Sequence, residues 1–260
     1  MKKISISALV GILFIGLNSG AQELARSTAE HDPYFDIGST ETRVTEQIEV
    51  ARPFSSIQLK NKLETYESPQ QTAAPLQTVQ GPLMIADLVL RVWSIIVANK
   101  PVVTVDSKAA NALPLLAKDH WEQLTGWKPE RWIGLTTTIK NGFGMRVIDL
   151  SYQVRLIYGG SVHGQGLYIA SAQVVPTSIN VLWGFNLNVM VDVASVVNVG
   201  TAESPAGQIT LNVTKIYGST FASHTEVSRF TVNAAGMMKN ATTDQVYFSS
   251  NQKLLPGAQE

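Results

Sequence analysis

Ser161 and His163 are the residues whose types and spacing come nearest to a catalytic pair. They lie in the glycine-rich segment GGSVHGQG, residues 159–166. A serine hydroxyl becomes a nucleophile when a histidine accepts its proton and an acid orients that histidine. Side chains two positions apart share a face only in a regular strand, and the glycines indicate a loop in which that geometry is not fixed. We interpret the segment as a polar hairpin connection and keep a Ser161–His163 hydrolase as the lesser alternative.

Other catalytic and metal-binding patterns are scarce. The chain has no Gly-x-Ser-x-Gly, His-Glu-x-x-His or phosphate-loop motif, and it contains no cysteine. Its histidines are dispersed, and none has a second histidine or cysteine at ligand spacing: His31, His120, His163 and His224. Acidic residues around His31 could hold a cation only loosely. The sequence therefore predicts no cofactor and no metal site, and it favours a protein that is not an enzyme.

The N-terminus has the pattern of a cleavable export signal. It combines a positive start, an apolar run and small residues before the cleavage point: Lys2 and Lys3, residues 4–17, Ser19 and Ala21. The run is shorter than the roughly 20 residues that span a bilayer. We expect residues 1–21 to be removed, which places the mature chain in the periplasm or outside the cell. Without cysteine it has no lipid anchor of the lipoprotein type and no disulfide.

Composition limits the classes of partner. Lys and Arg total 20, as do Asp and Glu, and 45% of the 260 residues are hydrophobic. A balanced charge gives no overall field that would concentrate the chain on nucleic acid or on an anionic membrane. We expect a globular protein that does not bind nucleic acid, and a protein partner or a homo-oligomer fits this composition.

Three regions follow the signal. Residues 22–67 are polar and form an arm or small subdomain with strand signals at 43–50 and 56–60. Residues 68–82, SPQQTAAPLQTVQGP, have three prolines and no charge, which is typical of a linker. Residues 83–260 are predicted to form one helix-braced antiparallel β domain.

Two helices are predicted at the start of that domain. Residues 83–98 lie between Pro82 and Pro101, and their few polar residues share one stripe at helical spacing: Asp87, Arg91 and Ser94. We interpret this segment as a core helix, with a membrane-seeking helix as the alternative. A second helix is predicted from Pro114 to about Gly126, with Trp121, Trp127 and Trp132 as aromatic anchors.

From Trp132 onward the apolar period changes to two, which is typical of strands with one buried face. Strands are expected at 146–158, 167–175, 209–217, 226–233 and 245–248. In residues 179–199 nearly every odd position is apolar, too long a run for one ordinary strand, so we predict a bend or an odd-length loop near 184–188 and buried odd-numbered side chains. The fold class is α+β: a predominantly antiparallel, β-sandwich-like C-terminal domain after two helices.

Three functions remain open. The favoured one is an exported, non-catalytic cell-envelope protein with a binding or structural role in an assembly, which an exposed apolar patch or a defined oligomer would support. The alternative is a membrane-inserting oligomeric β-pore or an outer-membrane-associated component, because membrane-spanning strands also have alternating apolar residues. A hydrolase built on Ser161 and His163 comes third.

Overall fold

The computed structural model describes residues 32–50, 85–88, 93–98, 109–118 and 121–250. For residues 85–88 and 93–98 the description is of the backbone. The predicted signal peptide, the linker at 68–82 and the strand at 56–60 lie outside these ranges, so they stay predictions.

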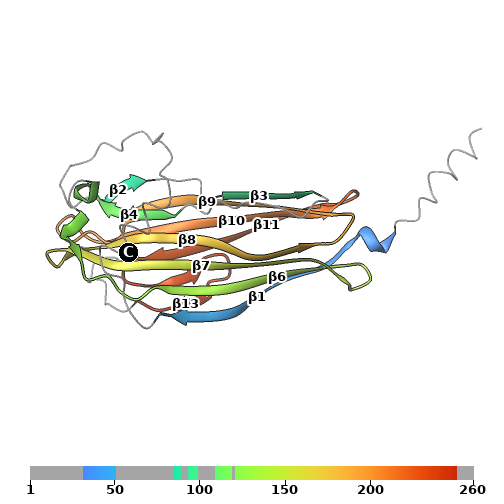
Figure 1. Ribbon diagram of the computed structural model, residues 1–260, viewed down its shortest axis with the longest axis horizontal. Coiled ribbons are helices and arrows are strands. Elements are labelled where there is room, and N and C mark those ends of the chain that lie inside the picture. The colour runs from blue at the N-terminus through green and yellow to red at the C-terminus, as the bar shows by residue number, and fades with distance from the viewer. Residues whose placement is uncertain (1–31, 51–84, 89–92, 99–108, 119–120, 251–260) are drawn as a thin grey trace, which may run out of the picture. The chain divides into compact units, whose positions relative to one another are not determined.

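Two antiparallel sheets make up the described part of the chain from Tyr34 onward (Figure 1). The first has the order β1-β6-β7-β8-β4-β2, with β5 paired to β7: β1 Ile37–Glu49, β2 Ile85–Leu88, β4 Ala110–Pro114, β5 Leu124–Thr125, β6 Arg131–Asn141, β7 Arg146–Val162 and β8 Gln165–Val181. The second has the order β13-β12-β11-β10-β9-β3: β3 Trp93–Ala98, β9 Phe185–Asn198, β10 Gly207–Ser219, β11 Ser223–Asn233, β12 Met238–Asn240 and β13 Val246–Phe248.

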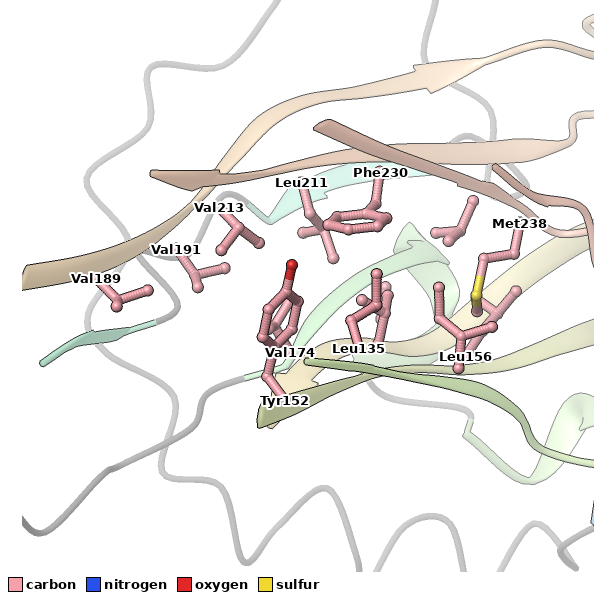
Figure 2. Packing of buried hydrophobic residues seen from close by; sticks show 14 of the residues in the cluster. Leu135, Tyr152, Leu156, Val174, Val189, Val191, Leu211, Val213, Phe230 and Met238 are labelled. Atoms are coloured by element: carbon pink, nitrogen blue, oxygen red, sulfur yellow. The ribbon is translucent and has the colours of Figure 1, made fainter. Parts of the chain in front are cut away.

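The core lies between the two sheets. Each sheet turns an alternating apolar face inward, and the buried side chains from both form one cluster (Figure 2). Its members include Leu135, Tyr152, Leu156 and Val174 from the first sheet and Val189, Val191, Leu211, Val213, Phe230 and Met238 from the second. The predicted antiparallel β-sandwich is confirmed.

The two predicted helices are wrong. Residues 83–98 contain β2 and β3, which pair with β4 and β9 respectively. Periodicity cannot separate a buried helix from buried strands in so apolar a run, and its many β-branched residues favour the sheet. In the second segment Pro114 ends β4, and the residues after it form two short 3-10 turns and β5: η2 Leu115–Lys118 and η3 Trp121–Gln123. The α+β class is therefore corrected to a sandwich of β-sheets.

Strand β1 comes from the segment interpreted as an arm or small subdomain. It pairs with β6 along its length, from Ile37 opposite Asn141 to Glu49 opposite Arg131. The strand predicted at 43–50 is thus an edge strand of the first sheet.

The alternating run 179–199 divides into three parts. Phe185, Leu187 and the next two odd positions are buried as predicted. Before them, Leu182–Gly184 forms an odd-length connection that carries the chain from β8 in one sheet to β9 in the other. After them, β9 has a register shift at Ala194, because Thr210 pairs with Ser195 while Leu211 pairs with Val193. Beyond this bulge the inward phase changes. The predicted burial of odd-numbered side chains is therefore complete for residues 185–191 and partial for Ile179, Val181 and Val193, which pack against the core cluster. It fails at Trp183 and Val197, which are exposed.

Candidate functional site: the aromatic tip

Ser161 and His163 lie near the β7–β8 turn. Ser161 Oγ donates a long hydrogen bond of 3.5 Å to the Thr125 carbonyl oxygen. His163 is exposed in the tight turn that follows β7, with a φ of 51°. Among the hydrogen bonds and ion pairs of the described residues, none joins these two side chains and none links His163 to a carboxylate. The arrangement expected of a nucleophile and its base is not assembled here.

The remaining candidate ligands do not converge either. Within the described ranges no three His, Asp or Glu side chains are close enough together to hold a metal ion. His224 stacks on Tyr217 with 5.8 Å between ring centroids, whereas His31 and His120 lie outside those ranges. No helix in the described part of the chain is long and apolar enough to cross a membrane.

Exposed apolar side chains gather instead at the end of the sandwich where β1 begins. Three connections meet there: the β6–β7 turn, the β8–β9 connection and the β10–β11 turn (Figure 1). Each presents one bulky ring to solvent, with exposed fractions of 62% for Phe143, 76% for Trp183 and 66% for Phe221. These are the three most exposed large apolar side chains in the described residues. We call Phe143, Trp183 and Phe221 the aromatic tip.

A layer of half-buried rings supports the aromatic tip from below. The short 3-10 turn η1, Pro33–Phe35, places Phe35 beside two of the connections. Its ring centroid lies 6.2 Å from that of Trp183 and 5.5 Å from that of Phe221. Tyr34 packs on Phe185, with 5.6 Å between their ring centroids, which joins this layer to the core cluster. Aromatic pairs in this range are attractive beyond their burial, so the layer holds the connections together.

Hydrogen bonds fix the shape of the β6–β7 turn. The Asn141 Oδ1 atom accepts from the backbone N–H groups of Phe143 and Met145, at 3.1 and 3.0 Å. The Asn141 Nδ2 group donates to the Tyr34 carbonyl oxygen at 3.2 Å. An asparagine used in this way stabilises a turn by satisfying backbone donors. Phe143 is therefore displayed by an ordered turn.

The other two connections are fixed in similar ways. Tyr34 Oη donates to the Trp183 carbonyl oxygen at 3.3 Å, and Ser219 Oγ accepts from the Phe221 N–H at 3.2 Å. Gly184, beside Trp183, has a φ of 85°, and a Cβ added there would lie 2.6 Å from Phe35. Glycine is needed at this position for both its conformation and the close approach of the ring.

Charges of both signs lie next to the aromatic tip. Lys140 and Arg146 flank the β6–β7 turn. Asp36 follows η1, and the charge of Glu41 on β1 interacts with that of Lys140. The surface is therefore apolar at its centre and carries both signs of charge at its rim.

A second polar cluster surrounds the side chain of Lys215. Lys215 is fully buried, and its Nζ donates to Glu226 Oε1 at 2.8 Å, Thr137 Oγ1 at 3.1 Å and Thr42 Oγ1 at 3.3 Å. Desolvation by burial lowers the pKa of Lys215, and the hydrogen bond and charge of Glu226 oppose that shift. All three ammonium donors have acceptors, so this group ties β1 and β6 to β10 and β11 rather than attacking a substrate.

Reasoning from sequence missed the aromatic tip. It did not single out Phe143 or Phe221, and the alternation wrongly assigned Trp183 to the core. A local signal for it exists in each connection: the ring is flanked by turn residues, as in NGFGM, LWGF and STFAS. A bulky aromatic residue at the apex of a turn has no strand neighbours to bury it. That signal identifies exposed rings but does not show that three turns meet.

No protein-family model, no curated protein and no solved structure matches the chain.

Proposed function

We propose that the chain is an exported, non-catalytic protein of the cell envelope, that its role is to bind, and that the aromatic tip is its binding surface. The observation that carries this proposal is the exposure of Phe143, Trp183 and Phe221 on three connections at the same end of the sandwich (Figure 1). Single exposed apolar residues are ordinary on a protein surface, whereas a cluster of large ones marks an interaction site.

The order of the surrounding structure supports this assignment. The connections are held by side-chain hydrogen bonds from Asn141, Tyr34 and Ser219, and by the ring of Phe35. Displaying rings on ordered turns reduces the entropy lost when they bind. The export signal predicted for residues 1–21 would place the chain outside the cytoplasm. No hydrogen bond joins Ser161 to His163 among the described residues, and we therefore prefer a binding role to hydrolysis.

Cysteine labelling tests the proposal without assuming the partner. The natural chain has no cysteine, so Trp183→Cys or Phe221→Cys introduces a single thiol. Gln165→Cys is the matched control, because Gln165 is exposed beside the turn at the opposite end of β7. A water-soluble maleimide should label all three purified variants. In intact envelopes it should label position 165 readily and positions 183 and 221 far more slowly. Equal labelling of the three positions in envelopes would contradict a binding role for the aromatic tip.

A further inference from the structure

We propose that the partner of the aromatic tip is the interfacial layer of a lipid bilayer, into which Phe143, Trp183 and Phe221 insert. This inference rests on the proposed function and adds the chemistry of the partner. Tryptophan and phenylalanine suit that layer, because their rings enter the acyl boundary while the indole N–H can stay among polar headgroups.

The apolar area fits a bilayer better than a second copy of the chain. With exposed fractions of 62–76% and ring side chains of about 150–250 Å² each, the three rings offer on the order of 400 Å². A standard protein interface buries about 800 Å² on each partner, so the aromatic tip alone would not hold a stable dimer.

A bilayer has no such minimum. One methylene corresponds to about 30 Å² when the hydrophobic energy per methylene is divided by that per unit area. An area on the order of 400 Å² therefore equals roughly 14 methylenes, the length of one myristoyl chain. A single chain of that length gives reversible membrane binding with an association constant on the order of 10⁴ M⁻¹. The aromatic tip is matched to weak, reversible attachment.

The mixed charge of the rim sets the lipid preference. Lys140 and Arg146 are offset by Asp36 and Glu41, so attraction to anionic headgroups contributes little. Binding driven by apolar insertion should depend weakly on salt, in contrast to attachment by a basic patch.

Flotation with vesicles of zwitterionic phosphatidylcholine tests the inference. The mature chain is compared with Phe143→Ser/Trp183→Ser/Phe221→Ser and with a control, Val44→Thr/Val227→Thr/Val246→Thr, which alters exposed apolar residues on strands β1, β11 and β13. Wild type and control should float equally, with partition nearly independent of salt. Each serine at the aromatic tip should weaken partition on the order of a hundredfold, so the triple variant should stay in solution. Unchanged unfolding midpoints establish that the variants are folded, and the single variant Trp183→Ser replaces the triple if the triple is unstable.

The outcomes separate the two proposals. If the wild type stays in solution while positions 183 and 221 are protected in envelopes, the bilayer is the wrong partner and the binding surface stands. A tip-dependent dimer that does not float would likewise overturn the bilayer in favour of a second copy. If protection is absent as well, the proposed function fails with it. Equal loss of flotation in the tip variant and in the control would overturn insertion through these rings.

Discussion

Val191 and Val197 occupy equivalent positions in the sequence pattern but opposite environments in the sandwich. Both are odd-numbered valines of β9, and the alternation predicts that both are buried. Val191 has no exposed surface and lies opposite Val213 in the core cluster (Figure 2), whereas 41% of Val197 is exposed beyond the bulge at Ala194. Replacing each by threonine keeps a β-branched side chain of similar size and adds one hydroxyl.

The cost of that hydroxyl differs between the two positions. Val191 is surrounded by apolar side chains, so a hydroxyl there loses its water without gaining a strong acceptor. Burial of an unpaired hydroxyl costs about 1–3 kcal/mol, and we expect Val191→Thr to lower the free energy of unfolding by about 2 kcal/mol. At Val197 the hydroxyl stays hydrated, and the change should remain within about 0.5 kcal/mol.

Urea unfolding of the mature chain measures both values. With a dependence on urea of about 3 kcal/mol per molar, Val191→Thr should shift the midpoint down by roughly 0.7 M with an unchanged slope, and Val197→Thr should leave it in place. A midpoint for Val197→Thr as low as that for Val191→Thr would refute the bulge and restore a continuous buried face.

Two further predictions concern a glycine and the buried lysine. Gly184→Ala should lower the free energy of unfolding more than Gly144→Ala does. Both glycines have φ near 80°, so both variants lose about 1–2 kcal/mol from backbone strain, but only the alanine at 184 would meet Phe35 at 2.6 Å. Thermal unfolding should therefore show a lower midpoint for Gly184→Ala than for Gly144→Ala. The lowered pKa of Lys215 means that, at pH values between that pKa and the ordinary value of 10.5, the unfolded chain binds more protons than the folded one. The stability of wild type relative to Lys215→Met should therefore rise with pH across that window, and a difference that is flat or falls with pH would contradict the buried ammonium.

Strands with one buried face were easier to predict from the sequence than the two strands within residues 83–98, for a physical reason. In β7 each inward position is apolar and each outward one is polar over most of residues 146–158, so the period of two is unambiguous. Residues 83–98 are apolar on nearly every side, and the choice between helix and strand depends on β4 and β9 being available as partners of β2 and β3. The partner of β3 lies about 90 residues later in the chain, and nothing within the segment itself indicates it.

Predicting the candidate site from the sequence would likewise have required knowledge of contacts between distant parts of the chain. Trp183 fits the odd-position alternation, and its exposure follows only from its place at the crossing between the two sheets. Phe143 and Phe221 are separated by 78 residues, and their common end of the sandwich is set by strand order. Local patterns identify each turn, whereas the surface exists only once both sheets have formed.

Quenching of tryptophan fluorescence by lipids brominated on their acyl chains detects insertion at the ring itself, because bromine quenches only rings that reach the acyl region. We expect strong quenching in wild type, loss of most of it in Trp183→Phe, and no recovery in Trp183→Phe/Gln165→Trp, where the indole is moved to the opposite end of β7. Quenching that is equal in wild type and Trp183→Phe, or that returns with the tryptophan at position 165, would contradict insertion through the aromatic tip.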